Sequence, residues 1–224
     1  SIKYKVNIEY STEVETPIDK IILEANNNWE KMIKDDYSKI VELFHGQLMY
    51  NIYDEDNMDS SISKTFEKYN SICLPITDET KNIYDCLNKY ITTNLNEDNQ
   101  YYYEKEDRKI NAIRKCTFWR NPLYLIMSFK RFEYNNTKNN QSIVFPTDNL
   151  DISDYSYLLN KYNCKYDLIS IGCHRGGTSF GHYYAICRKS QNIWFLYNDS
   201  SVSKITDINK ELKSILKDVY FLIY

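Results

Sequence analysis

A histidine and two polar residues that could orient it stand at the ends of two neighbouring predicted strands. His182 precedes the apolar segment 183–187, and Asn198 and Asp199 follow the next one, 193–197. If these segments pair as adjacent antiparallel strands, either Asn198 or Asp199 lies beside the start of the strand that carries His182. An imidazole held by an amide or a carboxylate is the base half of a cysteine-protease triad, because the third residue fixes the tautomer and direction of the ring. A lone histidine is more often structural, so the prediction depends on the pairing.

Glycine is concentrated in the loop that leads to this histidine. The chain has five glycines in 224 residues, and four of them (Gly172, Gly176, Gly177 and Gly181) fall within ten residues. Glycine permits positive φ and lets another backbone approach closely. From the residues alone, the loop could be a mobile turn, a phosphate-binding loop or the rim of an active site. The phosphate-binding loop is the least favoured, since no helix N-terminus follows it.

The elements that must position these residues are short apolar segments joined by turns. In the second half of the chain they predict a mainly antiparallel sheet, with a helix over 206–216 that has Thr206 as its N-cap. The predicted strands are 123–129, 143–145, 166–171, 183–187, 193–197 and 219–224.

The first half of the chain has helical and extended segments. Apolar steps of three and four residues predict a helix over 29–44, which Gly46 ends. Residues 48–74 are expected to be extended, and a second helix over 78–93 has Asp78 as its N-cap. Residues 94–111 are expected to form an exposed strand pair, and residues 1–28 to be irregular or strand-like. The fold class is therefore α+β, with residues 48–111 as a projecting subdomain.

Composition excludes several classes of protein. The formal charge of −3 carries no strongly basic balance that would attract nucleic acid. No run approaches the roughly 18 consecutive apolar residues of a membrane span, and the first residues have no signal-peptide core. The six cysteines are scattered without a CxxC pair, which suits a reducing compartment, so we expect a cytoplasmic or nuclear protein. Cys73, Cys86 and Cys116 sit among apolar residues and are expected to be core thiols.

Several segments taken together resemble the palm of the ubiquitin-specific proteases, the papain-like deubiquitinases of peptidase family C19. The family's histidine box is close to G-H-Y-x-A, then W, then [FY]-[ND]-D-S-x-V, and this chain matches nearly all of it. Weaker similarity extends upstream to about residue 29. The matching segments, in chain order, are Trp29–Gln47, Thr65–Ile76, Leu125–Phe132, Phe145–Pro146, Tyr166–Leu168, Gly181–Ala185, Trp194–Val202 and Val219–Tyr224.

The resemblance implies a fold and an activity. Residues 1–224 would form a partial ubiquitin-specific protease domain, with 48–111 as a fingers-like region and 112–224 as the palm. The activity would be thiol-dependent hydrolysis after the C-terminal glycine of ubiquitin, and the partners would be ubiquitin or ubiquitinated proteins. His182 would be the base, Asn198 would hold its imidazole, and Asp199 would assist. The residues that would border the ubiquitin tail are Phe145, Gly176, Gly177, Gly181 and Tyr183.

The chain departs from the family pattern at the nucleophile. The family's cysteine lies in an N-terminal box near G-N-T-C, which this sequence lacks, so the thumb segment is expected to be missing and the fragment alone inactive. Cys173 stands across the loop from His182. It lacks a helix N-terminus that would lower its pKa, and so it is not favoured as a substitute.

The fingers depart from the family pattern as well. Many relatives bind a structural zinc there through two CxxC pairs. The corresponding positions here are Asp54, Asn57, Tyr103 and Glu106. Without thiolates the four-sulfur site cannot form, so we expect no metal and no cofactor.

Two other hypotheses remain open. The chain could be a protease-dead relative that binds ubiquitin or scaffolds a complex, or an α+β domain with no link to ubiquitin. The presence of His182 together with Asn198 and Asp199 favours the enzyme, and the number of matching segments disfavours the unrelated domain.

Overall fold

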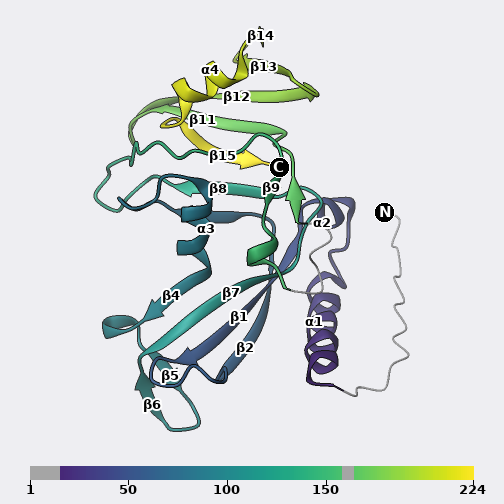
Figure 1. Cartoon of the computed structure of the whole chain (residues 1–224), viewed down its shortest axis with the longest axis vertical. Coiled ribbons are helices and arrows are strands. Elements are labelled where there is room, and N and C mark those ends of the chain that lie inside the picture. Colours follow the sequence, from purple (N-terminus) through teal and green to yellow (C-terminus); the bar gives the residue numbers. More distant parts are fainter. Residues whose placement is uncertain (1–15, 158–163) are drawn as a thin grey trace.

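Two sheets lie one above the other along the long axis of this computed structural model, which describes residues 16–157 and 164–224 (Figure 1). The lower sheet is four-stranded and antiparallel, in the order β2-β1-β7-β4. A small hairpin of β5 and β6 extends from it. The bounds are β1 (Gly46–Asp54), β2 (Ser63–Tyr69), β4 (Thr92–Leu95), β5 (Tyr101–Tyr103), β6 (Arg108–Ile110) and β7 (Ala112–Arg120).

The upper sheet has seven strands in the order β14-β13-β12-β11-β15-β8-β3. The pair β3–β8 is parallel, and the other pairs in this sheet are antiparallel. A separate short pair joins β9 (Leu150–Asp151) to β10 (Lys165–Tyr166). The bounds are β3 (Ile72–Pro75), β8 (Ile126–Lys130), β11 (Ser170–Gly176), β12 (Gly181–Ser190), β13 (Ile193–Asn198), β14 (Ser201–Ile205) and β15 (Val219–Ile223). The predicted α+β class with mainly antiparallel sheets is therefore confirmed.

Strand pairing divides the chain differently from the predicted regions 48–111 and 112–224. β7 falls in the second range but pairs with β1 of the lower sheet over eight positions. β3 falls in the first range but pairs with β8 of the upper sheet. The segment 143–145 forms no strand, and Val144 makes a single bridge to Asn82. These differences come from pairings between distant parts of the chain, which local patterns do not encode.

The first helix starts earlier than predicted. Residues 17–28, expected to be irregular or strand-like, belong to α1 (Pro17–Ile33), which Thr16 and Asp19 open with a capping box. The predicted helix over 29–44 is also interrupted. A second helix, α2 (Lys39–Phe44), begins after Ser38, whose hydroxyl caps the backbone N–H of Val41. Ser38 thus opens a new helix where the apolar spacing suggested a continuous one.

The other two helices begin after the residues predicted as their N-caps. The cap of α3 (Ile83–Ile91) is Asn82, which forms a capping box with Asp85, and not Asp78. The cap of α4 (Ile208–Ile215) is Asp207 and not Thr206. In both cases a polar residue closer to the apolar face supplies the acceptor for the first free N–H groups.

One large core packs α3 and α4 against the upper sheet. Its fully buried side chains include Ile83 and Leu87 from α3, Ile215 from α4, and Ile171 and Ile186 from the sheet. A second cluster lies under α1 and contains Ala25, Met49, Phe66 and Trp119. A third joins the lower sheet to the β5–β6 hairpin and contains Ile52, Ile110 and Ala112.

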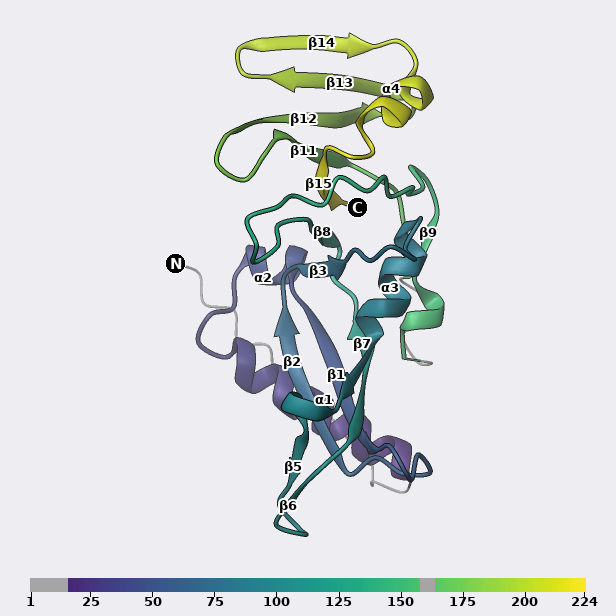
Figure 2. The same ribbon diagram turned by 90° about the vertical axis from the view of Figure 1, so that its left-hand side faces the viewer.

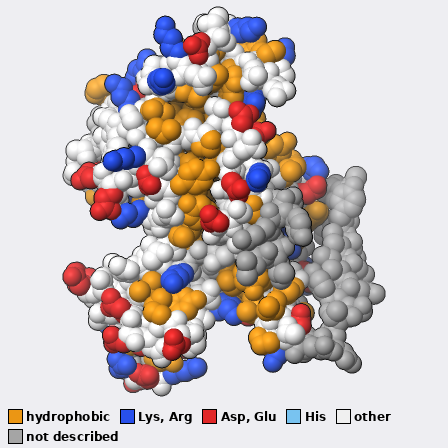
Figure 3. All heavy atoms as spheres, viewed as in Figure 1, with side chains coloured by type: hydrophobic (Ala, Val, Ile, Leu, Met, Phe, Trp, Pro, Cys, Tyr) orange, Lys and Arg blue, Asp and Glu red, His pale blue; other side chains and the backbone are white. Residues whose placement is uncertain are grey.

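The surface carries charges of both signs. On the face shown in Figure 3, basic and acidic side chains are interspersed around patches of apolar atoms, and the described residues visible there form no continuous basic stripe. Among residues 16–157 and 164–224, no helix is both long and apolar enough to cross a membrane.

Candidate active site

β12 and β13 bring His182 and Asn198 into contact. The strands pair antiparallel with Ala185 opposite Tyr197, so the start of β12 lies beside the end of β13. Nε2 of His182 is 2.5 Å from Oδ1 of Asn198. Oδ2 of Asp199 is 3.8 Å from the same nitrogen, and Asp199 is much more exposed than His182. Of the two predicted orienting residues, the structure therefore places Asn198 in hydrogen-bond contact and Asp199 just beyond it.

The contact with Asn198 fixes which nitrogen of His182 can act as a base. An amide oxygen only accepts hydrogen bonds, so Nε2 carries the proton and donates it to Oδ1. In the neutral ring the free lone pair is then on Nδ1. Any group that is to lose a proton to His182 must approach Nδ1.

The glycine-rich loop is a tight turn between β11 and β12. Gly176 pairs with Gly181, and the N–H of Gly177 donates to the carbonyl of Phe180. Gly176 has φ of 125°, a conformation that L side chains rarely adopt. A strand follows the loop, so there is no helix N-terminus for a phosphate group. Figure 2 shows that this turn and the turn between β13 and β14 lie on the same side of the sheet.

The residues predicted to border the ubiquitin tail are not all near this turn or open to solvent. Gly176, Gly177 and Gly181 are in the turn, and Tyr183 is exposed beside His182. Phe145 is only 7% exposed and packs in the large core. Its burial does not favour contact with a ubiquitin tail.

Three further aromatic residues surround Tyr183, and sequence reasoning missed them. Ring centroids are 4.5 Å apart for His174–Tyr183, 5.4 Å for Phe132–His174, 5.7 Å for Phe132–Tyr220 and 6.3 Å for Tyr183–Tyr220. These contacts close a ring of four side chains, which we call the aromatic cluster. The sequence held one signal, because His174 and Tyr183 are equally far from the turn and must pair across it.

A polar network supports the same hairpin from its neighbour β15. Nε of Arg175 is 2.9 Å from Oδ2 of Asp218, and the hydroxyl of Tyr184 donates to the same oxygen. The backbone N–H of His174 donates to the carbonyl of Asp218. The network ties β11, β12 and the residue before β15 together just behind the turn.

Arg131 is fully buried; its guanidinium lies 5.6 Å from the ring centroid of Phe129 and donates hydrogen bonds to four backbone carbonyls. Its guanidinium donates to Asn139 and Gln141, and also to Leu216 and Val219. It thereby joins the loop after β8 to the segment between α4 and β15. This loop reaches the glycine turn, since Oγ1 of Thr178 donates to the carbonyl of Asn136.

None of the six cysteines is suited to react with the help of His182. Cys173 is fully buried, and burial is the main cause that raises its pKa to about 12. Cys187 lies five residues along β12 from His182, roughly 16 Å away at strand spacing. Cys73 is exposed, against the prediction of a core thiol, but β3 is four strands away from β12 in the sheet. Cys86 and Cys116 are buried as predicted, and Cys164 is buried as well.

The fingers positions that many relatives use for zinc do not fit a metal here. Asp54 and Asn57 bridge each other in a turn, where their side chains accept hydrogen bonds from the backbone N–H groups of Asp56 and Asp59. Glu106 forms an ion pair with Arg108. In the described part of the chain, no group of three or more His, Cys, Asp or Glu side chains could hold a metal ion.

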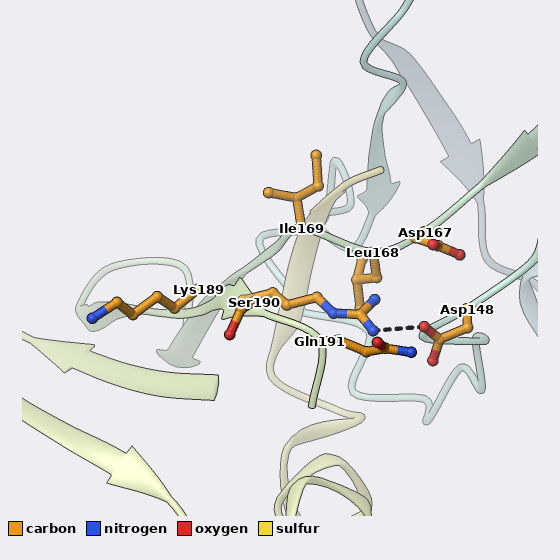
Figure 4. Close-up of a pocket in the computed structure, with 8 residues that line it drawn as sticks. Asp148, Asp167, Leu168, Ile169, Lys189, Ser190 and Gln191 are labelled. Carbon is orange, nitrogen blue, oxygen red and sulfur yellow. Dashed lines mark hydrogen bonds and ion pairs between the residues drawn. The ribbon is translucent and has the colours of Figure 1, made fainter. Parts of the chain in front are cut away.

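A cavity of about 360 Å³ lies at the other end of β12 (Figure 4). Arg188 lines it and donates to Oδ1 of Asp148 at 2.7 Å, and Lys189 extends away from Asp148 and Asp167 (Figure 4). Its residues Arg188–Gln191 are six or more positions along the chain from His182, roughly 20 Å or more at strand spacing. The cavity is therefore separate from the His182–Asn198 pair.

Comparison with known proteins identifies the family of sequences that this chain matches. The sequence model of the family "Ubiquitin carboxyl-terminal hydrolase" matches residues 9–224. The probable ubiquitin carboxyl-terminal hydrolase R319 of Acanthamoeba polyphaga mimivirus is 29% identical over 85% of this chain and 43% of its own length. Ubiquitin carboxyl-terminal hydrolase 8 of Saccharomyces cerevisiae is 28% identical over 97% of this chain and 46% of its own length. The chain thus spans less than half the length of these two relatives.

Solved structures show the same fold. The SAGA Ubp8/Sgf11/Sus1/Sgf73 DUB module bound to ubiquitin aldehyde contains a chain with a TM-score of 0.70 and 28% identity. The match covers 92% of this chain and 47% of that one. A yeast SAGA DUB module with a mutant form of Sgf73 gives a TM-score of 0.72 at 28% identity, over 89% and 44% of the two chains.

Proposed function

The chain belongs to the ubiquitin carboxyl-terminal hydrolase family, and on that premise we propose that it supplies the base and the orienting residue of a thiol-dependent deubiquitinase. The observation that carries the proposal is the contact between His182 and Asn198, which leaves Nδ1 of the imidazole free. The reaction is hydrolysis of the peptide or isopeptide bond after the C-terminal glycine of ubiquitin.

His182 moves the proton in both halves of this reaction. Its Nδ1 takes the proton of a cysteine thiol, and the thiolate attacks the glycine carbonyl carbon. The imidazolium then gives its proton to the lysine amine as the carbon–nitrogen bond breaks, which leaves a thioester. In the second half, Nδ1 takes a proton from water as its oxygen attacks the thioester carbon, and the imidazolium returns that proton to the cysteine sulfur as the carbon–sulfur bond breaks. Asn198 keeps the ring aimed and its tautomer fixed throughout. Asp199, 3.8 Å away and exposed, assists electrostatically.

The glycine-rich turn and the aromatic cluster form the wall along which the ubiquitin tail lies. A tail that ends in two glycines has no side chains to anchor it, so recognition depends on a narrow, flat surface. Tyr183 follows His182 in β12, is exposed and contacts the ring of Tyr220, and a Cβ atom on Gly177 would meet nothing within 4 Å. Ubiquitin or ubiquitinated proteins are therefore the proposed partners.

The nucleophilic cysteine lies upstream of these 224 residues. The support for this step is chemical, because Cys173 is buried with a raised pKa and the other thiols lie at a distance from His182 or in the core. A reactive thiol needs an environment that lowers its pKa, such as a helix N-terminus. None of the six cysteines lies in a helix N-terminal turn except Cys86, which is buried and whose pKa is raised to about 11.

The test uses a longer protein that includes the residues preceding Ser1 and a fluorogenic substrate attached to the C-terminus of ubiquitin. The upstream sequence is expected to contain a cysteine box, and the longer protein to turn over the substrate. His182→Ala is expected to abolish turnover while ubiquitin binding survives. Full activity of this variant would exclude the proposed role of His182, and turnover by the 224-residue chain alone would exclude an upstream nucleophile.

A ubiquitin-binding or scaffold module without catalysis is the second candidate. The observation that favours it is that no suitable thiol faces His182 within the chain. The same experiment separates the two candidates. Binding of ubiquitin by the longer protein with no turnover, together with an upstream sequence that has no cysteine box, would support the second.

A further inference from the structure

His174 packs against both residues that flank His182. A Cβ atom added to Gly181 would lie 2.1 Å from Nε2 and 2.7 Å from Cε1 of His174. On the other side, the ring of Tyr183 lies 4.5 Å from that of His174, centroid to centroid. The ring of His174 therefore touches the chain immediately before and immediately after His182.

The position of His174 is itself fixed from behind. The residue is only 4% exposed, and its ring meets the edge of Phe132. Its backbone N–H donates to the carbonyl of Asp218 at 2.7 Å, and its carbonyl accepts from Nζ of Lys138 at 2.5 Å. A ring held on all sides in this way acts as a rigid support.

His182 needs such a support because its own side chain is poorly confined. That side chain is 48% exposed, and its hydrogen bond is to Asn198, also near the surface. A half-exposed ring is oriented mainly by where its backbone lies and by the one bond it makes. A small shift at the start of β12 would therefore break the contact.

His174 supports the start of β12 through the shape of its ring and not through hydrogen bonds of the ring. Nδ1 of His174 is buried without a hydrogen-bond partner among the described residues. A buried nitrogen without a partner costs free energy compared with a satisfied one. The side chain thus makes its contribution through the space that it fills beneath Gly181 and Tyr183.

We propose that His174 is a positioning residue whose ring holds the start of β12 so that His182 stays within hydrogen-bond distance of Asn198. Glycine is needed at position 181 for this packing, since any larger residue would collide with the ring of His174. The consequence for catalysis rests on the proposed function. The geometric claim does not, because it concerns only the pairing of two side chains in this chain.

The test reads the pairing directly by NMR of ¹⁵N-labelled imidazoles in the full 224-residue chain. The chain has three histidines, so assignment by substitution is straightforward. Correlations from each ring nitrogen to the ring carbon protons show whether Nδ1 or Nε2 carries the proton. In the unaltered chain, His182 is expected to be the Nε2–H tautomer, and Asn198→Ala gives the reference for a lost pair.

Three variants form a cycle with one matched control. His174→Ala and Gly181→Ala are each expected to shift His182 towards the mixed tautomers of the Asn198→Ala reference. Compared with Gly181→Ala, the double variant should recover part of the native His182 signal, because the missing imidazole ring of residue 174 leaves room for the new methyl group. Recovery is only partial, since the carbonyl oxygen of Arg175 still lies 3.0 Å from that methyl position. Gly177→Ala, with nothing within 4 Å of its Cβ, should leave the imidazole signals unchanged.

Each outcome decides the proposal. A native His182 tautomer in folded His174→Ala would overturn it. So would a double variant in which the loss of the Nε2–H signal of His182 equals the sum of the losses in the two single variants. If His174→Ala does not fold, native signals in Gly181→Ala would likewise overturn it, and altered signals there would support it. Failure of the proposed function is a separate result, because it shows as missing turnover in the longer protein with the His182–Asn198 pair intact.

Discussion

Nε2 of His182 donates a hydrogen bond to Oδ1 of Asn198 over 2.5 Å, from the start of one strand to the end of its neighbour. This contact joins residues 16 positions apart and determines the chemistry of the imidazole. It makes Nδ1 the basic nitrogen of the neutral ring.

Asn198→Ala should lower turnover in the longer protein by less than His182→Ala does. Removal of a general base costs on the order of 10²- to 10⁴-fold. Asn198→Ala leaves the base in place but releases its tautomer and direction. Asp199→Ala is the matched control and should have the smallest effect, because Asp199 is 3.8 Å away and exposed. Steady-state kinetics with a ubiquitin C-terminal substrate rank the variants by their loss of turnover. A larger loss for Asp199→Ala than for Asn198→Ala would mean that Asp199, and not Asn198, orients the imidazole.

Thiol reactivity should separate Cys73 from Cys173. Cys73 is exposed, whereas Cys173 is fully buried with a pKa raised to about 12. The nucleophile is the thiolate, so a thiol with so high a pKa reacts little at about pH 8. Brief alkylation of the native chain followed by peptide mass spectrometry should label Cys73 and leave Cys173 unmodified until urea is added. Rapid labelling of Cys173 in the folded chain would contradict its exclusion as the nucleophile.

The stability of the chain should fall on acidification through the titration of His174. Burial, and next the charge of Lys138, lower the pKa of His174 below 6.5, while Asp218 opposes this. The unfolded chain therefore binds more protons just below pH 6.5, and the free energy of unfolding should rise with pH through that window. Urea unfolding at several pH values measures the slope. His174→Asn should flatten it relative to His45→Asn, and equal slopes for both variants would contradict the prediction.

The sequence predicted that Asn198 or Asp199 lies beside His182, because this proximity depends on local geometry, and only the family resemblance favoured Asn198. Two consecutive antiparallel strands with a short turn bring their ends together whatever surrounds them. His174 could not be assigned in the same way. Its burial depends on Phe132 from the loop after β8 and on Tyr183 across the hairpin, while Tyr220 of β15 closes the ring of contacts. Contacts between strands that are distant in sequence decide such a site, and no periodicity reports them.

The missed helix α1 has a different cause, because its signals are local and were present in the sequence. Its buried face is narrow, with Ala25 as its one fully buried residue, and packs on Met49, Phe66 and Trp119 of the lower sheet. Residues 17–28 nevertheless carry apolar side chains at Ile18, Ile21, Ile22 and Ala25, which is the i, i+3, i+4, i+7 spacing of an amphipathic helix. The start of the helix also has a local signal. Thr16 and Asp19 form a capping box, and Pro17 between them occupies the first helical position.

Arg131→Lys should destabilise the chain strongly. The guanidinium of Arg131 donates to four carbonyls from two segments, and a lysine ammonium cannot reach all of them in that geometry. Each buried carbonyl left without a partner costs about 1–3 kcal/mol, so urea denaturation should show a loss on the order of 3 kcal/mol or more. Arg108→Lys, at an exposed ion pair with Glu106, should change stability by less than about 1 kcal/mol. Similar midpoints for the two variants would mean that Arg131 does not hold the segments together.

The lower sheet should be stabilised by its apolar cluster and not by a metal. Ile52, Ile110 and Ala112 are buried there, with Tyr101 and Tyr103 packed against them. The turn residues Asp54 and Asn57 use their side chains to accept backbone N–H groups instead of binding an ion. Ile110→Ala should therefore cost about 2–5 kcal/mol, the usual loss for a buried isoleucine. A chelator should leave the melting temperature of the unaltered chain unchanged. A lower melting temperature with chelator, restored by added zinc, would instead show that a metal holds this sheet, and the apolar cluster would lose the role assigned to it.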